Sequence, residues 1–317
     1  MANQRRRATW ALLIMTFLWG YTFVWIKSAL DIADERLGAD ALTLTVGLFM
    51  TIRFLGAAVL LPIVVPVARQ GLRDSAVWKA GAILSVFVLA GFLLQMFGMH
   101  GIDSATSAFL TSLYVIFTAA ALAVWSRKLP STSMIVGIAA ATIGAGFISG
   151  PPQITFDQSE WLTVLCAAAF AGHILATDYY TKRLPPLTIT LTTFVITGIC
   201  CVALVGLGVA QNPQTSSADI WSLVSDPKFL SPALMCTVFG SVICLSIMNV
   251  YQRHLSPVRA AILFALEPVW AALIALAVGQ VDPDGWFIFG ASALLGGNLI
   301  VELVPRLMRE RESTKPV

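Results

Sequence analysis

Ten predominantly apolar runs follow one another along the chain, each about 20 residues long and each ended by a short polar break. A helix needs about 20 residues to cross a hydrocarbon core of about 30 Å. Because the runs contain Gly, Ala and Thr and show no alternation of period two, we expect helices and not the strands of a barrel. The sequence therefore predicts an all-α integral membrane protein with ten transmembrane helices. The runs span residues 9–29, 41–67, 78–99, 102–124, 132–150, 160–180, 187–210, 229–252, 257–279 and 285–305.

The composition agrees with a surface that faces lipid. Charged residues make up only 12% of the chain, apolar residues make up 57%, and the mean hydropathy is +0.82. A soluble domain carries roughly 25% charged residues to cover its surface. This chain of 317 residues has about half of that proportion of charged residues, which is too few to cover its surface in water. We therefore expect the lipid bilayer to surround most of it.

The basic residues predict the orientation of the helices. If the N-terminus is cytoplasmic, 16 of the 20 Lys and Arg residues fall in the inner segments, whereas the outer loops hold only Arg36 and Lys228. Cytoplasmic loops carry such an excess in membrane proteins, so we expect both termini on the cytoplasmic side of the plasma (inner) membrane. Because these residues sit at helix ends and form no continuous stripe, the net charge of +3 needs no nucleic acid as a partner. The inner residues are Arg5, Arg6, Arg7, Arg69, Arg73, Lys79, Arg127, Lys128, Lys182, Arg183, Arg253, Arg259, Arg306, Arg309, Arg311 and Lys315.

An internal duplication appears when the chain is aligned with itself at an offset of about 152 residues. The segment 104–120 then matches the segment 256–272, and Trp19-Gly20 falls on Ala171-Gly172. We therefore expect a first repeat over residues 1–150, a second over residues 157–305 and a basic cytoplasmic tail over residues 306–317. Since five helices is an odd number, the second repeat must enter the membrane with opposite polarity. Inverted repeats of this kind are typical of secondary transporters, which bind their substrate between the halves near the membrane midplane.

Several short segments carry a resemblance to a known family. They are Leu18-Trp19-Gly20-Tyr21-Thr22-Phe23-Val24-Trp25-Ile26-Lys27, Arg53-Phe54, Ala108-Phe109-Leu110-Thr111 and Leu266-Glu267-Pro268-Val269-Trp270-Ala271-Ala272-Leu273. Over about residues 10 to 305 the chain resembles the EamA family of the drug/metabolite transporter superfamily. The resemblance implies ten helices in two inverted halves and export of amino acids, other metabolites or drugs, with proton coupling in some members.

The chain departs from the family pattern at the ends of the two related helices and within the first of them. Family repeats often end these helices with Gly-Glu or a nearby acid, whereas here Arg127-Lys128 and Gly279-Gln280 occupy those places. Ile116 also stands where a proline is common in the first half. We therefore expect a Glu-Pro break only in the second half, at Glu267-Pro268.

Glu267 is the strongest candidate for proton coupling. It lies about nine residues into the run 257–279, near mid-bilayer. A charge there costs at least about 2.5–3.5 kcal/mol, and protonating a free glutamate at pH 7 costs about 3.7 kcal/mol. Because the two costs are similar, Glu267 can exchange a proton, as a proton-coupled carrier requires. Pro268 adds a free carbonyl at Phe264, since proline lacks the N–H that would bind it. The alternative is that Glu267 stays ionised in a structural pair.

Arg53 is the expected partner of Glu267, because the two residues have a similar depth in the membrane. If the side chains touch, both stay charged and the pair is a strut or a gate. If they lie apart, Arg53 is free to attract a carboxylate of the substrate. Depth follows from the sequence and lateral position does not; between the two we favour a structural role.

Polar residues recur on one face of two helices. Steps of three and four residues put Ser104, Ser107, Thr111, Tyr114 and Thr118 on one face of the run 102–124. Such a stripe either lines a watered cavity or bonds to a neighbouring helix. The run 160–180 shows a shorter stripe that contains His173, which either relays protons or bonds to a nearby backbone.

These patterns predict a substrate site and a coupling or gating pair. Buried amides need partners, and indole rings can form an aromatic wall for an amphipathic solute, although plain packing accounts for the tryptophans equally well. The expected substrate-binding residues are Trp19, Thr22, Gln95, Thr111, Tyr114, His173, Thr177, Asn249 and Trp270, and the expected coupling or gating residues are Glu267 and Arg53.

Small residues predict close helix contacts in the runs 132–150 and 285–305. Their glycines permit such contact either within the bundle or across a homodimer through these two helices, the fifth and the tenth. The five cysteines all fall in apolar runs, where they are expected to pack as small apolar residues, neither paired nor bound to metal. The glycines are Gly144, Gly146, Gly150, Gly290, Gly296 and Gly297.

An intramembrane enzyme is the main alternative from another class. Neither H-E-x-x-H nor G-x-S-x-G occurs, no Walker motif is present, and we expect no metal and no cofactor. A receptor would not explain the inverted duplication. We therefore expect a secondary transporter that exports a small metabolite, such as an amino acid, or a drug-like amphipathic solute by alternating access with proton coupling. A pH-independent facilitator of the same fold is the alternative.

Overall fold

Helices make up all the regular structure of the part of the chain that is described. The computed structural model describes residues 2–125, 127, 132–147, 151, 156–255, 260 and 263–313, and no strand occurs among them. The helices are α1 (Ala2–Leu37), α2 (Leu42–Val64), α3 (Ser75–Gly101), α4 (Ser104–Thr111), α5 (Tyr114–Trp125), α6 (Thr132–Phe147), α7 (Gln158–Thr181), α8 (Pro186–Gln211), α9 (Ser217–Ser225), α10 (Pro227–Met235), the π-helix η3 (Cys236–Ile243), α11 (Cys244–Tyr251), α13 (Glu267–Ala277) and α14 (Gly285–Ser313), with short 3-10 turns η1 (Ala39–Ala41), η2 (Pro66–Arg69) and η4 (Gln252–His254).

Seven of the described helical segments are long and apolar enough to cross a membrane. Three further apolar helices, Ile135–Ala145, Glu267–Ala277 and Gly285–Ile300, are shorter over the described residues. The expectation of an all-α membrane protein is therefore confirmed. The long segments are Gln4–Leu37, Ala39–Val64, Ser75–Gly101, Ser104–Trp125, Gln158–Thr181, Pro186–Gln211 and Pro227–His254.

Local chemistry accounts for where several helices begin. Asp157 forms a capping box with Glu160 at the start of α7, and Asp74 and Asp103 accept backbone hydrogen bonds at the starts of α3 and α4. The capping box between Ser216 and Asp219 begins α9, a short helix in the break that precedes α10. The apolar runs gave no sign of α9, because its nine residues are too few to form a spanning run.

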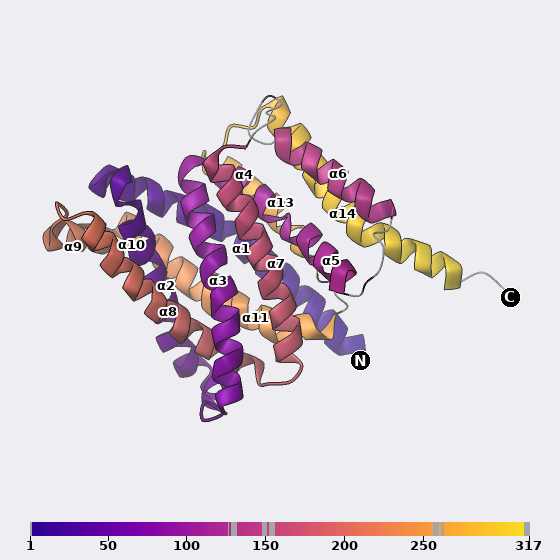
Figure 1. The fold of residues 1–317 in the computed structure, drawn as a ribbon, viewed down its shortest axis with the longest axis horizontal. Coiled ribbons are helices and arrows are strands. Elements are labelled where there is room, and N and C mark those ends of the chain that lie inside the picture. The colour runs from indigo at the N-terminus through magenta and orange to yellow at the C-terminus, as the bar shows by residue number, and fades with distance from the viewer. Residues whose placement is uncertain are drawn as a thin grey trace.

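Helices from the two halves of the chain pack against each other (Figure 1). The most extensive contacts join α2 to α8, α6 to α14, α3 to α7 and α3 to α8, followed by the contact of α1 with α13. The beginning of α1 and the end of α14 lie on the same side of the molecule in Figure 1. Each half therefore completes its packing mainly with the other half.

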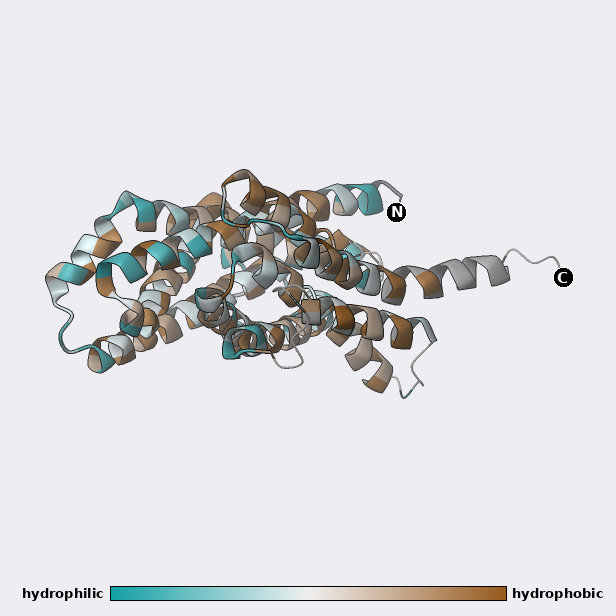
Figure 2. Ribbon diagram, turned by 90° about the horizontal axis from the view of Figure 1, so that it is seen from above, coloured by the Kyte–Doolittle hydropathy of each residue, from teal (hydrophilic) through white to brown (hydrophobic). Residues whose placement is uncertain are grey.

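The outward surface of the bundle is apolar. Val59, Val86, Ile199 and Val124 expose more than half of their side-chain surface. In Figure 2 the brown, hydrophobic ribbons prevail over the body of the molecule, and teal gathers at the left end and at the N-terminus. Exposed apolar side chains in this arrangement are typical of helices that face lipid.

Two helices are interrupted near the middle of their spans. The backbone turns at Ser112 and Leu113 between α4 and α5, and again at Ala265 and Leu266 just before α13. The second break was expected from Pro268. The first break was not predicted, because the first half has Ile116 and no Glu-Pro pair.

Side-chain hydrogen bonds explain the break between α4 and α5. The hydroxyl of Ser112 donates to the carbonyl of Phe109 at 2.6 Å, and the amide of Asn298 donates to the Ser112 hydroxyl at 2.9 Å and to its carbonyl at 3.3 Å. These bonds compete with the helical backbone pattern and hold the turn at Ser112, whose carbonyl also accepts from the backbone N–H of Val115 at 3.0 Å. A residue far along the chain therefore replaces the missing proline.

The glycines of α6 and α14 serve a contact within the chain. A side chain at Gly144 would lie 2.5 Å from the backbone nitrogen of Leu294, and one at Gly297 would lie 2.6 Å from the carbonyl of Gly137. Gly296 has open space instead, and Gly150 lies outside the described residues. Close packing of these two helices therefore needs Gly144 and Gly297, and a homodimer through α6 and α14 stays a prediction.

Candidate substrate cavity

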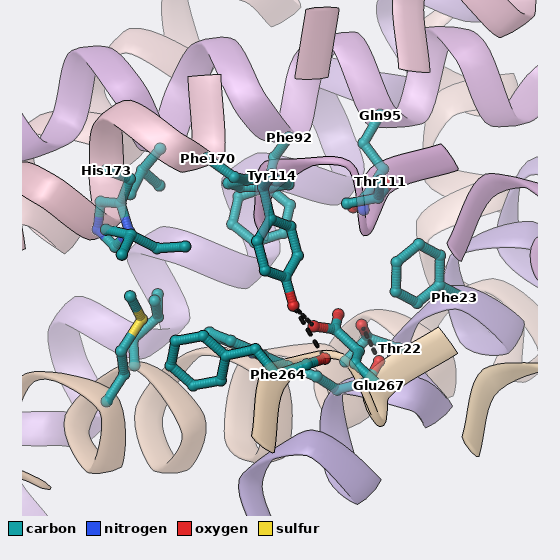
Figure 3. A pocket seen from close by; sticks show the side chains of 15 residues that line it. Thr22, Phe23, Phe92, Gln95, Thr111, Tyr114, Phe170, His173, Phe264 and Glu267 are labelled. Atoms are coloured by element: carbon teal, nitrogen blue, oxygen red, sulfur yellow. Dashed lines mark hydrogen bonds between the residues drawn. The ribbon is translucent and has the colours of Figure 1, made fainter. Parts of the chain in front are cut away.

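One cavity lies among the helices α1, α3, α4, α5, α7, α11 and α13 (Figure 3). Its volume is about 50 Å³, which is room for a few water molecules. Because drug-sized solutes need a larger pocket, the surrounding helices must separate before such a solute enters. The cavity is lined by Trp19, Thr22, Phe23, Val88, Phe92, Gln95, Thr111, Tyr114, Phe170, His173, Ile174, Leu245, Met248, Phe264 and Glu267.

The carboxylate of Glu267 and the hydroxyl of Tyr114 meet in this cavity. The Tyr114 hydroxyl donates to Oε2 of Glu267 at 2.9 Å and lies 3.1 Å from the carbonyl of Phe264 (Figure 3). Both side chains are buried, with exposed fractions of 6% and 5%. The breaks in the two helices bring these groups together, because α13 begins at Glu267 and α5 begins at Tyr114.

Pro268 and the start of α13 shape the surroundings of Glu267. Proline has no N–H, so the carbonyl of Phe264 lacks its helical partner and accepts from Tyr114 instead. The freed carbonyl that the sequence predicted is therefore present and used. Glu267 is also the first residue of α13, where the free N–H groups and the helix dipole stabilise a negative charge.

A tyrosine hydroxyl has one proton, and two acceptors lie within its reach. When Glu267 is ionised, Tyr114 can donate to the carboxylate. When Glu267 is protonated, its own O–H can donate to the Tyr114 oxygen, and Tyr114 can donate to the Phe264 carbonyl. Glu267 therefore has a hydrogen-bond partner in either protonation state, as a proton carrier requires, while the Phe264 carbonyl receives the Tyr114 proton only when Glu267 is protonated.

Aromatic rings form much of the remaining wall. Phe92 and Phe170 meet edge to face with their centroids 5.1 Å apart, and Trp19 lies 6.5 Å from Phe264. His173 stands at the far side of the cavity from Glu267 in Figure 3, and its Nε2 is 3.5 Å from the hydroxyl of Thr177. The cavity thus combines a few polar groups with apolar, flat surfaces, a pattern typical of sites for small organic ligands.

The cavity brings together seven of the eleven residues predicted to bind substrate or couple protons. Thr177 lies beside it through its contact with His173. Asn249 donates to the Thr190 hydroxyl at 2.6 Å, and Trp270 packs edge to face on Phe17, so neither lines the cavity. The seven are Trp19, Thr22, Gln95, Thr111, Tyr114, His173 and Glu267.

Arg53 and Glu267 do not form an ion pair, although their depths match. The Arg53 guanidinium instead donates through Nε to the hydroxyl of Ser241 at 2.8 Å, and it lies 4.0 Å from the centroid of the Phe92 ring. It is fully buried behind the cavity wall. Of the two alternatives that the sequence left open, the structure therefore agrees with the one in which the side chains lie apart, because lateral position can separate side chains of similar predicted depth.

A layer of hydrogen bonds closes the bundle one to two turns of α1 beyond the cavity. The amide of Gln280 donates to the Ser28 hydroxyl at 2.8 Å and to the Val24 carbonyl at 3.2 Å, and the Ser104 hydroxyl donates to the Gln280 side-chain oxygen at 2.9 Å. Gly279, with φ of 73°, ends α13 in the left-handed conformation that directs Gln280 into this layer. An ionised glutamate at position 280 could not donate a hydrogen bond to the Val24 carbonyl. This is a physical reason why the chain has Gly279-Gln280 where family repeats often have Gly-Glu.

The sequence analysis missed Gln280 and the aromatic residues Phe92, Phe170 and Phe264. Phenylalanines in apolar helices look alike in sequence whether they face lipid, the core or a cavity. Gln280 was visible only as a departure from the family pattern, and its contacts involve residues about 176 and 252 positions away. Long-range contacts of this kind are not readable from local spacing.

A bundle of long apolar helices around a cavity with a few polar groups defines the class of integral membrane proteins with an internal polar site. The EamA-like transporter family matches residues 6–150 and again residues 158–303, so the chain belongs to this family. The resemblance noted in the sequence is therefore confirmed, and the protein is a membrane transporter.

Two further comparisons agree with this assignment. An uncharacterized transporter of Archaeoglobus fulgidus is 22% identical over 306 residues, which cover 95% of this chain and 87% of that protein. A solved crystal structure matches 92% of this chain and 98% of that chain with a TM-score of 0.55. At 18% identity, this second likeness concerns the fold alone.

Proposed function

We propose that this protein is a secondary transporter that moves a small amphipathic solute by alternating access, with Glu267 as the group that couples transport to protons. The observation that carries the proposal is the buried carboxylate of Glu267 at the cavity. It forms no ion pair among the described residues, and its Tyr114 partner can serve both of its protonation states. A carboxylate that is neither neutralised by a cation nor locked in one form is free to exchange a proton.

The proposed architecture is ten transmembrane helices in two inverted five-helix repeats. Three observations support it: the three shorter apolar helices add to the seven long spans, the family matches two stretches of nearly equal length, and both halves contain an interrupted helix at related positions. In such proteins, exchange of conformation between the halves turns an inward-open state into an outward-open one.

The small cavity supports an occluded form of the transporter. A space of about 50 Å³ cannot hold an amino acid or a drug-like solute, so binding requires helix movement. The layer around Gln280 ties α1 to α4 and to the end of α13, and we assign it the role of a gate on that side. Opening this gate would break the hydrogen bonds of Gln280, and these bonds include no ion pair.

The proposed location is the plasma (inner) membrane, with both termini cytoplasmic and export of a small metabolite as the direction of transport. The common side of the two ends in Figure 1 supports the placement of the termini. The bias of basic residues toward that side supports the cytoplasmic assignment.

Transport by proteoliposomes tests the role of Glu267. A metabolite panel is first screened by thermal stabilisation of the purified protein, and each hit is then measured by uptake with and without a pH gradient. We expect the gradient to drive the wild type and to have no effect on Glu267→Gln, because an amide cannot release a proton. Asp31→Asn is the control, since Asp31 lies at the surface beside Lys27 and away from the cavity.

An unchanged pH dependence in Glu267→Gln would assign the pH-independent facilitator in place of the proton-coupled carrier. A solute that is chemically altered and not relocated would contradict transport itself and favour an intramembrane enzyme.

A further inference from the structure

Arg53 carries a buried charge that the protein satisfies only in part. Its side chain is 0% exposed, and Ser241 takes its Nε hydrogen, but Nη1 and Nη2 have no hydrogen-bond partner over the described residues. The rings of Phe92 and Phe54 lie 4.0 Å and 5.4 Å from the guanidinium carbon. Arginine stays protonated in proteins, so this is a permanent cation inside the membrane span.

Two ring contacts and one hydrogen bond offset only part of the free-energy cost of burying the charge of Arg53. A cation over an aromatic face gains less free energy than an arginine loses on transfer to mid-membrane. The terminal nitrogens also form the fork that binds a carboxylate through two parallel hydrogen bonds. In Arg53 these are the two nitrogens left without a partner.

The unpartnered end of Arg53 lies directly behind the cavity wall. The Phe92 ring lines the cavity (Figure 3). The same ring lies over the guanidinium of Arg53. Gly240 brings a second wall residue close: a side chain there would lie 2.8 Å from the methyl of Thr22 and 3.1 Å from Nη2 of Arg53. The Phe92 ring therefore both contacts the guanidinium and lines the cavity, and its rotation away from the guanidinium would open the charge toward the cavity.

We propose that Arg53 recognises a carboxylate on the transported solute, reached when the Phe92 ring turns away from the guanidinium. This inference rests on the proposed function and adds the substrate class: a small organic carboxylate, or a zwitterion that carries one, with an apolar body that fits the aromatic walls. Phe92 acts as a cover that stabilises the cation while the site is closed. Glu267, which is not paired with Arg53, then remains free for the proton.

The π-helix η3 supports a functional setting for this group. Residues Cys236–Ile243 form this π-helix. π-helices are rare, and they occur often at functional sites. Helix η3 supplies Ser241 to Nε of Arg53 and, through the Gly240 carbonyl, accepts from the indole of Trp19 at 3.0 Å. The same segment thus orients Arg53 and one cavity wall.

Matched pairs of solutes test the proposal without any transport. Thermal unfolding of the purified protein is measured over a range of concentrations of phenylacetate, 3-phenylpropionate or hexanoate, so that binding is read from the stabilisation. The amide of each compound, which has the same apolar body and no charge, is measured in parallel. We expect at least one carboxylate to bind the wild type roughly tenfold or more tightly than its amide, because hydrogen bonds to charged groups have this strength. Arg53→Gln should abolish the difference, and Arg53→Lys should retain part of it.

Two further variants keep the test decisive if Arg53→Gln fails to fold. Phe92→Ala removes the cover, so the carboxylate preference should increase; a merely structural arginine would give no charge-selective gain. Lys27→Gln is the matched control, because Lys27 is already held by the carbonyls of Met99 and His100. Equal binding of carboxylates and amides in the wild type, or a preference that survives in Arg53→Gln, would overturn the role of Arg53.

The outcomes separate this inference from the function on which it rests. If transport that depends on Glu267 persists while no carboxylate exceeds its amide, only the assignment of Arg53 falls. If no solute from the metabolite panel is relocated across proteoliposomes, the proposed function itself fails.

Discussion

At the scale of single residues, the hydroxyl of Tyr114 connects both halves of the chain at the cavity. It comes from the start of α5 and reaches two acceptors at the break before α13, the carboxylate of Glu267 and the carbonyl of Phe264. Without this hydroxyl, a buried carboxylate and a carbonyl that proline has already deprived of its partner would both lack a donor. Tyr114 therefore contributes to stability as well as to the proposed proton site.

Tyr114→Phe should lower the free energy of unfolding by about 1–3 kcal/mol, the cost of leaving buried polar groups unsatisfied. Unfolding of the purified protein in detergent, followed by thermal or denaturant titration, measures the loss. The control is Tyr179→Phe, which should change stability by less than about 0.5 kcal/mol, because Tyr179 is half exposed. Equal stability of Tyr114→Phe and the wild type would contradict the network.

At the scale of elements, paired helices are held together where glycines let backbones touch. α6 and α14 approach so closely that a side chain at Gly297 would collide with the backbone of Gly137 and Ala141. Its neighbour Gly296 turns away and meets nothing within 4 Å. Adjacent glycines on one helix therefore have opposite roles, which only the orientation of the helix reveals.

Gly297→Ala should destabilise the protein, because the added methyl would lie 2.6 Å from a backbone carbonyl that cannot move without shifting α6. Gly296→Ala should be neutral or stabilising by up to about 1 kcal/mol, since alanine favours a helix over glycine. Melting temperatures of the two variants in the same detergent make the comparison.

The same preparations, sized by light scattering, test the predicted homodimer: reduced dimerisation in Gly296→Ala alone would place the interface on the open face of α14.

At the scale of the whole molecule, the distribution of basic residues and the shared side of the chain ends lead to one topology. Single cysteines introduced for Asn3 and Ser313 should react with an impermeant thiol reagent only from the cytoplasmic side. A cysteine for Gln214, in the segment before α9, should react only from the opposite side. The unmodified chain is the control, because its five cysteines lie in apolar segments. Labelling of residues 3 and 313 from different sides would contradict the inverted arrangement of the two halves.

The sequence by itself determined that this protein lies in a membrane, and it predicts the depth of the polar residues there. The length of the apolar runs, compared with the thickness of the bilayer, identified helices long enough to cross lipid, and position within a run predicts that Glu267 lies near mid-membrane. Pro268 was enough to predict the free carbonyl of Phe264. These inferences work because translation along a helix is set by 1.5 Å per residue, a property of the backbone alone.

Only the tertiary structure decided which residues at one depth meet. It separated Arg53 from Glu267, put Tyr114 against Glu267, broke the helix at Ser112 through the distant Asn298, and turned phenylalanines into a cavity wall. The physical reason is that contacts across a bundle depend on the rotation and neighbours of each helix. In a chain whose helices are apolar on nearly every face, local sequence carries little information about either.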